Sequence, residues 1–465
     1  MGTAVIDIGK SNVKLTVLGG DGDAVFEART PNNALPGPPY AHHDLDGIWH
    51  WLLESLRRAA GSCAVDAIVT TTHGATAVVM AGDRPALPAL DYEQPLPEDT
   101  GAAYEALRGD FAETGSPSLP YGLNLGRQLY WLQTAWPEAF SEATDILTYP
   151  QYWTFRLTGE RVGEVTSLGC HTDLWAPARR DYSHLVRERG WDRLMPDLAP
   201  AWQTVGTIGD EVAAATGLAS STRVINGIHD SNASYLAHLT TTEPPFTVVS
   251  SGTWVICMAA GGSLDGLRAE QDMLVNVDVH AHPVPCARFM GGREYAALAG
   301  HAPGSVQAEI ADVASLVEQG ILATPGFADQ GGPFPGRMGG VTPHTPDSPA
   351  LREALAALYT ALVTDYCLDA VGAAGGIAVE GSLAGNRLFL QVLAALRRSQ
   401  TVTASGDAAG TTAGAALLAR GAPQPGERTA SGEPVPALDL PELADYRTRW
   451  RARATVSPRR PRPAD

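Results

Sequence analysis

Two segments of the chain share one pattern: an apolar run, a glycine turn and a second apolar run. The first segment combines residues 3–9, in which Asp7 is the one charged residue, with residues 13–18. The second combines residues 246–251 with the apolar run that follows Thr253. Apolar runs of this length between turn residues predict buried strands. Each segment therefore predicts a hairpin, and the recurrence indicates a duplicated fold.

Strand and helix patterns alternate through the rest of the chain. Residues 67–72 predict a strand that ends at His73, and residues 224–229 predict a strand that is followed by a helix of small residues. Such alternation is typical of an α/β architecture. Residues 261–304, by contrast, are expected to be rich in loops because glycine and proline interrupt them.

The length of 465 residues is too great for a single hydrophobic core. We expect an N-terminal domain over residues 1–237, a C-terminal domain over residues 238–425 and a tail over residues 426–465. Proline and arginine dominate the tail, so its end is expected to be partly disordered.

Charge and cysteine usage narrow the class of protein. A formal net charge of −18 argues against a nucleic-acid binder or a polybasic membrane surface. The five cysteines lack paired spacing, which indicates a reducing compartment and neither a disulfide framework nor a zinc site. With no basic-then-apolar leader and no long apolar run, we expect a cytoplasmic protein without nucleic-acid or membrane partners.

The turn of the first hairpin carries the only two lysines of the chain, Lys10 and Lys14, although the chain has 33 basic residues. An ammonium group is a compact point charge that a guanidinium group does not replace. The strand-borne Asp7, which faces this turn of amide and ammonium donors, suits Mg²⁺ and nucleotide phosphates. In the alternative interpretation, Asp7 only bonds the turn at the end of its strand.

The predicted strand before Asp230 delivers a carboxylate to the start of a helix. The turn at Ser251, Gly252 and Thr253 can point backbone N–H groups and hydroxyls at an anion. A carboxylate together with an anion cradle favours a base that acts on a hydroxyl group as the hydroxyl receives a phosphoryl group. In the alternative interpretation, Asp230 is a helix cap and the turn is an ordinary one.

Taken in order along the chain, these motifs resemble the FGGY family of carbohydrate kinases over about residues 3–420. The resemblance rests on Asp7-Ile8-Gly9 with Lys14, on residues 227–230, on residues 250–254, on residues 381–386 and on the closing helix at 410–419. It implies an α/β protein of two actin-like (ribonuclease H-like) domains, with a cleft for nucleotide and sugar between them.

The resemblance also implies the roles of the residues, with ATP and Mg²⁺ as cofactors. Asp230 would be the catalytic base and Asp7 the metal-binding residue. The nucleotide-binding residues would be Gly9, Lys10, Ser11, Asn12, Lys14, Ser251, Gly252, Thr253, Gly381, Ser382 and Asn386. The substrate-binding residues would be His73, Gly74, Asp91, Tyr92, His229 and Asp230. Three departures stand out. The family commonly has threonine at Lys10 and a second glycine at Ser382, and its usual arginine-bearing sugar loop is replaced here by Asp91-Tyr92-Glu93.

The implied activity is the ATP-dependent phosphorylation of a primary hydroxyl of a ketose. His229-Asp230 and Pro150-Gln151-Tyr152 resemble the rhamnulose kinase branch, which favours a 6-deoxyketose such as L-rhamnulose or L-fuculose. Xylulose, ribulose, fructose, glycerol and erythritol are alternative substrates. The protein could also form a homodimer. A sensor of sugar or nucleotide on a kinase scaffold is the alternative from another class. A hydrolase that uses His229, Asp230 and Ser231 is disfavoured, because adjacent residues do not readily form a triad.

Overall fold

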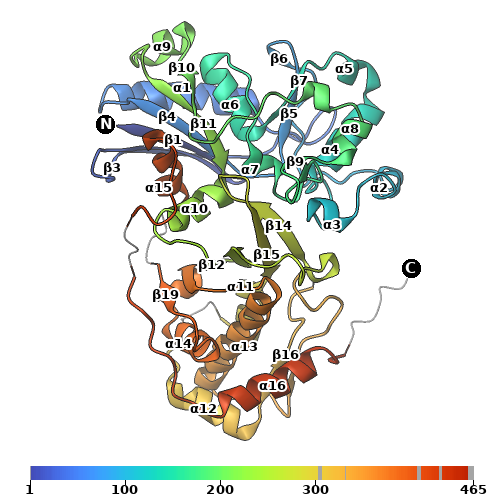
Figure 1. Ribbon diagram of the computed structural model, residues 1–465, viewed down its shortest axis with the longest axis vertical. Helices are drawn as coiled ribbons and strands as arrows, with labels where there is room; N and C mark the ends of the chain where they lie inside the picture. Colours follow the sequence, from blue (N-terminus) through green and yellow to red (C-terminus); the bar gives the residue numbers. More distant parts are fainter. Residues whose placement is uncertain (1, 302–305, 330, 406–409, 429–431, 459–465) are drawn as a thin grey trace. The chain divides into compact units, whose positions relative to one another are not determined.

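The structure, a computed structural model, describes residues 2–301, 306–329, 331–405, 410–428 and 432–458. The chain forms two compact units (Figure 1). Unit 1 comprises Met1–Thr241, Val275–Pro283 and Ala409–Glu427. Unit 2 comprises Thr242–Leu274, Val284–Ala408 and Arg428–Asp465.

Unit 1 is built on a mixed six-stranded sheet with the order β10-β11-β4-β1-β2-β3. Its strands are β1 (Thr3–Ile8), β2 (Asn12–Leu18), β3 (Ala24–Pro31), β4 (Ala67–Thr72), β10 (Thr204–Thr207) and β11 (Arg223–His229). The strands β1, β4 and β11 run parallel, so their carboxyl ends lie at one edge of the sheet. This edge is where α/β sheets bind ligands.

Helices cover both faces of this sheet, as the contacts of α1 and α6 on one side and of α10 and α15 on the other show. The helices of unit 1 are α1 (Leu45–Ala60), α2 (Glu98–Glu105), α3 (Phe111–Thr114), α4 (Leu125–Ala135), α5 (Pro137–Ser141), α6 (Tyr149–Thr158), α7 (Val165–Leu168), α8 (His184–Glu188), α9 (Asp210–Thr216), α10 (Asp230–Leu239) and α15 (Gly410–Leu417), with 3₁₀ turns η1 (Asp192–Leu194) and η4 (Leu418–Arg420). The smaller sheets are β6-β5-β7 (Arg84–Pro85, Ala77–Ala81, Asp145–Thr148) and β8-β9 (Trp175–Ala176, Asp181–Tyr182).

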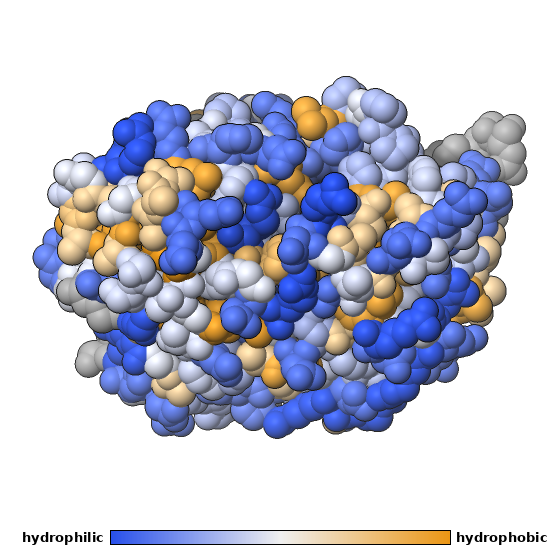
Figure 2. All heavy atoms as spheres, turned by 90° about the horizontal axis from the view of Figure 1, so that it is seen from above, coloured by the Kyte–Doolittle hydropathy of each residue, from blue (hydrophilic) through white to orange (hydrophobic). Residues whose placement is uncertain are grey.

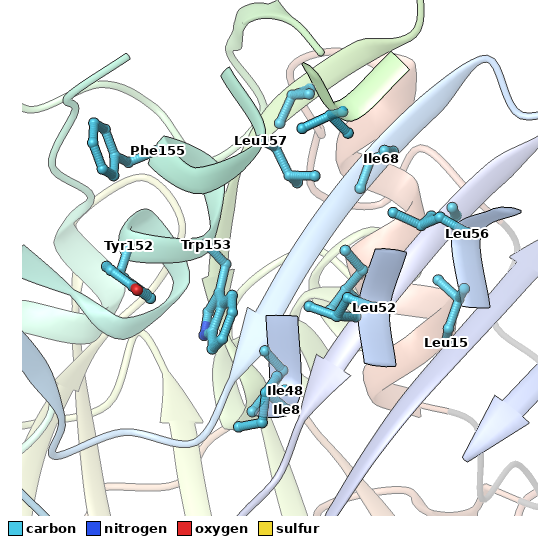
Figure 3. Close-up of a cluster of buried hydrophobic side chains, with 14 of the residues drawn as sticks. Ile8, Leu15, Ile48, Leu52, Leu56, Ile68, Tyr152, Trp153, Phe155 and Leu157 are labelled. Carbon is cyan, nitrogen blue, oxygen red and sulfur yellow. The ribbon is translucent and has the colours of Figure 1, made fainter. Parts of the chain in front are cut away.

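The main core of unit 1 lies between this sheet and helices α1 and α6. Figure 3 shows Leu52 of α1, Trp153 of α6 and Ile68 of β4 among the side chains of this cluster. All three are at most 1% exposed. Complete burial of side chains of this size stabilises the fold by about 1.5–3 kcal/mol each. The core thereby fixes the positions of the strand ends that carry the polar residues.

Unit 2 repeats the design with a mixed six-stranded sheet in the order β14-β15-β13-β12-β18-β19. Its strands are β12 (Phe246–Ser251), β13 (Val255–Ala260), β14 (Met273–Val277), β15 (Pro283–Phe289), β18 (Gly376–Gly381) and β19 (Val402–Ala404), with a separate pair β16 (Leu322–Thr324) and β17 (Gly340–Thr342). Its helices are α11 (Gly291–Ala299), α12 (Ile310–Gln319), α13 (Pro349–Ala370), α14 (Arg387–Leu396) and α16 (Leu443–Ala454), with 3₁₀ turns η2 (Ala269–Gln271) and η3 (Ser382–Gly385).

The two predicted hairpins are present as β1–β2 and β12–β13. In both, the first strand pairs antiparallel with the next strand and parallel with a later one, β4 in unit 1 and β18 in unit 2. The recurrence seen in the sequence is therefore a recurrence of topology. The expectation of a loop-rich stretch at residues 261–304 was wrong, because β14, β15 and α11 lie within it.

The units differ from the contiguous domains expected at 1–237 and 238–425. Residues 238–241 group with unit 1, and the chain returns to unit 1 at Val275–Pro283 and at Ala409–Glu427. The second return packs α15 against α10 so closely that a Cβ on Gly414 would lie 1.8 Å from the carbonyl oxygen of Ala233. A helix of small residues permits this approach of two backbones, but the sequence alone does not name its partner helix.

The stretch expected to be a tail contains the helix α16 of unit 2. Its side chains Tyr446 and Trp450 are fully buried, and they donate hydrogen bonds to the carbonyl oxygens of Ile321 (2.6 Å) and Ala323 (2.7 Å). Helix α16 of the tail is therefore part of the unit's core.

Disorder was expected over residues 457–465. It was wrong for the first two of these residues, because the carbonyl oxygen of Ser457 accepts from Arg337 (2.5 Å) and that of Pro458 accepts from Met338 N–H (2.8 Å). Residues 459–465 lie outside the described residues.

Figure 2 shows a face on which hydrophilic residues predominate and hydrophobic residues occur in scattered groups. Among the described residues, no helix combines the length and the apolar character that crossing a membrane requires.

Candidate active site

The turn of the first hairpin borders a hollow of about 490 Å³ on unit 1. The residues that line it are Asp7, Gly9, Ser11, Asn12, Lys14, Glu27, Ala28 and Arg29. Five of these were predicted from the sequence to bind nucleotide or metal. Lys10 belongs to the same turn, but it is not among the lining residues.

Asp7 lies on β1 with Lys14 and Thr71 as its neighbours on the two adjacent strands. Burial and the nearby carboxylate of Asp230 raise the pKa of Asp7 to about 6, and the Lys14 ammonium opposes this shift. A divalent cation would relieve both the burial cost and the repulsion between carboxylates. The donor set therefore suits Mg²⁺.

The described residues hold no cluster of three or more histidine, cysteine or carboxylate side chains that could bind a metal ion by itself. Mg²⁺ is usually bound through one or two carboxylates, waters and the phosphates of a substrate, and not by a cage made of protein alone. Asp7 beside a phosphate-binding turn matches that arrangement.

Two residues that shape this turn were missed by the sequence analysis. Asn32 donates from its amide to the carbonyl oxygen of Gly9 (2.7 Å), and Arg29 donates from Nε to Oδ1 of Asn12 (3.1 Å). Both lie on or next to the neighbouring strand β3, and neither belongs to a motif. Lys14 forms an ion pair with Glu27 of β3 (3.0 Å) and still lines the hollow.

Asp230 is the first residue of α10 and follows directly on β11. The register of β11 against β4 shifts between Ile225 and Ile228, at a bulge where Gly227 has a φ of +93°. A Cβ on Gly227 would lie 2.5 Å from the carbonyl oxygen of Thr70, so only glycine fits there. The bulge redirects the end of the strand that carries His229 and Asp230.

Buried polar groups hold the bulge in place. The side chain of Asn226 is fully buried and donates to the carbonyl oxygens of Ala199 (2.9 Å) and Gly163 (3.1 Å). Gln151, from the segment that resembled the rhamnulose kinase branch, donates to the carbonyl oxygen of Asn226 (3.0 Å). The glutamine therefore supports the strand that leads to Asp230.

His229 is buried, and both of its ring nitrogens have neighbours. Nδ1 lies 2.8 Å from Oδ1 of Asn232, and Nε2 lies 3.2 Å from Oδ1 of Asp230. Asn232 donates from its amide to the carbonyl oxygen of Val277, which leaves its Oδ1 to accept from Nδ1–H of His229. Asn232 was not singled out from the sequence, although its position three residues after His229 was visible there.

The predicted substrate residues of unit 1 form one group. The ring of His73 packs edge-on against that of Tyr92, with centroids 5.5 Å apart, and a Cβ on Gly74 would lie 2.8 Å from Nε2 of His229. Lys10 pairs with Asp91 at 2.5 Å and lies 5.0 Å from the centroid of the Tyr92 ring.

His73 presents a hydrogen-bond acceptor. Its Nδ1 lies 2.9 Å from the carbonyl oxygen of Gly74, so this nitrogen carries the proton. Burial lowers the pKa of His73, which keeps the ring neutral and leaves Nε2 as a bare acceptor. Among the described residues this buried atom has no hydrogen-bond partner. A hydroxyl group of a ligand could supply one.

In unit 2, the turn of the second hairpin consists of Gly252, Thr253 and Trp254. Gly252 N–H donates to the carbonyl oxygen of Trp254 (2.8 Å), and Gly252 and Thr253 are exposed. The hydroxyl of Ser251 donates to the carbonyl oxygen of Glu380 (2.5 Å) and accepts from Leu383 N–H (2.9 Å). Ser251 therefore ties the hairpin to the segment after β18.

That segment holds the last group of predicted nucleotide residues. Gly381 and Ser382 are exposed at the end of β18. Asn386 caps α14, because its Oδ1 accepts from Phe389 N–H (3.0 Å), and its amide donates to the hydroxyl of Tyr295 (2.8 Å). The helix start that the sequence indicated at Asn386 is confirmed.

Solved structures with the same fold are sugar kinases. A carbohydrate kinase from Novosphingobium aromaticivorans superposes with a TM-score of 0.91 and 37% sequence identity, covering 97% of this chain and 100% of that chain. A xylulose kinase from Rhodospirillum rubrum gives a TM-score of 0.77 at 19% identity over 97% of each chain, which shows the fold alone. The expected class, an α/β protein with two actin-like domains, is confirmed.

Two family models cover most of the sequence. The N-terminal domain of the FGGY family of carbohydrate kinases matches residues 3–237, and the FGGY carbohydrate kinase C-terminal domain matches residues 243–428. The chain belongs to the FGGY family of carbohydrate kinases, as the resemblance predicted. It is also 29% identical to an L-fuculokinase of Salmonella typhi over 275 residues. That match spans 56% of this chain and 57% of the relative, little more than half of either.

Proposed function

We propose that the protein transfers a phosphoryl group from ATP, with Mg²⁺, to a primary hydroxyl of a ketose. The observation that carries this proposal is the pair of carboxylates, Asp7 and Asp230, in unit 1. They lie close enough for the charge of Asp230 to raise the pKa of Asp7, and Asp7 lines the hollow beside a glycine turn. One carboxylate for a metal and one for a proton are what phosphoryl transfer to an alcohol requires.

Asp230 is the catalytic base in this proposal. Its carboxylate accepts the proton of the sugar hydroxyl while the hydroxyl oxygen attacks the γ-phosphorus in line. About a third of its side chain (30%) is exposed, so a substrate can reach it, and the N-terminus of α10 favours its negative charge. His229 lies beside this carboxylate, with its Nε2 3.2 Å from Oδ1 of Asp230.

The nucleotide phosphates are assigned to the turns of both hairpins. In unit 1 they would meet Gly9, Ser11, Asn12 and Lys14 around the hollow, and Mg²⁺ would bind Asp7 through water. In unit 2 they would meet the exposed Gly252 and Thr253, and the adenosine would meet Gly381 and Ser382, with Asn386 fixing the helix start beside them. Mg²⁺, when bound, neutralises the charge that develops on the transferred group.

The sugar is assigned to His73, Gly74, Asp91, Tyr92 and His229. The neutral His73 accepts a hydroxyl proton at Nε2. The charged groups of this cluster, Lys10 with Asp91 and Glu93, sum to a net negative charge. This balance favours a neutral sugar over a sugar acid.

Among neutral sugars, the proposal favours a 6-deoxyketose. The relative from Salmonella typhi is named L-fuculokinase, and the segments His229-Asp230 and Pro150-Gln151-Tyr152 point to the same branch. L-Fuculose and L-rhamnulose therefore come first, and xylulose, ribulose, fructose, glycerol and erythritol complete the panel to be assayed.

The test is Asp230→Asn, assayed by ATP consumption against this panel. Turnover should fall about 10²–10⁴-fold, because the amide cannot accept the proton, while the sugar still binds. Asp210→Asn is the matched control, since Asp210 is the first residue of α9 in the same unit and is exposed. It should keep wild-type turnover.

Near-normal turnover in Asp230→Asn would remove the assignment of the base. If the wild-type protein phosphorylates no member of the panel, the enzymatic proposal is overturned and a sensor of sugar or nucleotide is favoured.

A further inference from the structure

The two lysines of the first turn have different surroundings although they lie four residues apart. Lys14 lines the hollow together with Asp7. Lys10 is absent from the lining and forms an ion pair with Asp91, with Nζ 2.5 Å from Oδ1. The side chain of Lys10 is 23% exposed, and that of Lys14 is 39% exposed. The phosphate-binding role that the sequence suggested for both lysines is thus matched by the surroundings of Lys14 alone.

Lys10 compensates a buried carboxylate. The side chain of Asp91 is 7% exposed, and its Oδ1 also accepts from Glu93 N–H (3.1 Å). The backbone of Asp91 is held as well, because its N–H donates to the carbonyl oxygen of Ala41 (3.0 Å) and its carbonyl oxygen accepts from Gln94 N–H (2.9 Å). A carboxylate buried to this extent requires an opposite charge close by.

The same ammonium group has two further partners in this loop. It lies 3.4 Å from Oε2 of Glu93 and 5.0 Å from the centroid of the Tyr92 ring, within the range of a cation–π contact. The Tyr92 ring in turn packs against His73, whose Nε2 lacks a hydrogen-bond partner in the part of the chain that the structure describes. One lysine thus connects the glycine turn with loop 91–93 and, through Tyr92, with His73.

We propose that Lys10 is a positioning residue for the sugar: it holds loop 91–93 in the conformation that binds substrate, and it does not bind nucleotide phosphate. This inference rests on the proposed assignment of the sugar to His73, Asp91 and Tyr92. Its physical basis is that the ammonium group already pairs with the carboxylates of Asp91 and Glu93. These two carboxylates compensate its charge, so its attraction for a phosphate is weak. Loss of the ammonium group would release loop 91–93 from the glycine turn.

The kinetic test compares Lys10→Met with Lys14→Met, because methionine keeps an apolar chain and removes the charge. Lys10→Met should raise KM for the sugar about 10- to 100-fold with little change in kcat or in KM for ATP. Lys14→Met should do the reverse and raise KM for ATP. Lys10→Arg should restore part of the sugar affinity, since it keeps the charge. Lys10→Gln, which also removes the charge, replaces Lys10→Met if that variant does not fold.

Hydrogen exchange of the free protein gives a readout that does not depend on activity. In Lys10→Met the backbone amides of residues 91–94 should exchange faster than in the wild type, while in Lys14→Met they should not change. If no sugar of the panel is phosphorylated, the proposed function fails and hydrogen exchange alone decides the role of Lys10. A rise of KM for ATP in Lys10→Met with an unchanged KM for the sugar would overturn the inference. Unchanged exchange of residues 91–94 would overturn it too.

Discussion

The two hairpins have the same backbone plan and different chemistry. When Gly9 is aligned with Gly252, Asp7 of β1 corresponds to Ser250 of β12. Asp7 has Lys14 as its cross-strand partner, whereas Ser250 has Ile256. One hairpin therefore carries a pair of opposite charges, and the other carries a hydroxyl beside an apolar residue.

The turns differ in length as well as in charge. Gly9 N–H donates to the carbonyl oxygen of Asn12 (2.9 Å), which encloses two residues, whereas Gly252 N–H donates to that of Trp254 (2.8 Å), which encloses Thr253 alone. The longer turn has room for Lys10, which reaches loop 91–93, while the shorter one carries neither a lysine nor a carboxylate. In the proposed function both turns bind phosphate, and the charges of the first hairpin add the contacts to metal and sugar.

Asp7→Ser gives the first hairpin the side-chain type of the second. It should weaken the apparent affinity for Mg²⁺ in the kinase assay about 10- to 100-fold, as expected for a residue that holds a metal through water. The measurement is the Mg²⁺ dependence of turnover at saturating ATP and sugar. An unchanged Mg²⁺ dependence would mean that the carboxylate is not what separates the two hairpins.

A second effect of Asp7 concerns stability. The folded protein raises the pKa of Asp7 from 3.8 to about 6, so the folded state binds this proton more tightly than the unfolded state. The stabilisation that results is present below about pH 4 and is lost as the pH rises through 6. Asp7→Asn, which cannot ionise, should therefore be more stable than the wild type at pH 7.5, by about 1–3 kcal/mol.

Thermal unfolding without Mg²⁺ and nucleotide, followed from pH 5 to pH 8, measures this difference. The gap in Tm between Asp7→Asn and the wild type should widen with rising pH. Ser250→Ala, at the equivalent uncharged position, should show a gap that does not depend on pH. A constant gap for Asp7→Asn would contradict the raised pKa.

Local patterns in the sequence were sufficient for the hairpins and for the placement of Asp230. Strands and glycine turns are determined by residues that are close in sequence. The predicted hairpins therefore agree with the observed ones at residues 3–18 and 246–260. The position of Asp230 between β11 and α10 follows from the same kind of signal. The family resemblance added the order of the motifs, which no single motif could supply.

Pairings between distant residues could not be predicted in this way. Lys10 and Asp91 are separated by 81 positions, and nothing near Lys10 in the sequence names its partner. The tail shows the same limit. Arg447 of α16 donates from Nε to Oδ2 of the fully buried Asp365 (2.6 Å), so an arginine of the stretch expected to be a tail anchors a helix. The prediction of loops at residues 261–304 failed for another reason. Proline was taken as a sign of a loop, but the prolines of β15 lie within a largely buried strand.

The smallest expected effect concerns phosphate binding by the backbone of the second hairpin's turn. A Cβ on Gly252 would meet no atom within 4 Å, so Gly252→Ala should leave the fold intact. If the nucleotide phosphates approach this backbone, the added methyl group should raise KM for ATP, by about tenfold or less, with KM for the sugar unchanged. Gly101→Ala in α2 is the matched control, because its Cβ also enters open space and no ligand is assigned there. Equal values of KM for ATP in the two variants would place the phosphates on the first hairpin alone.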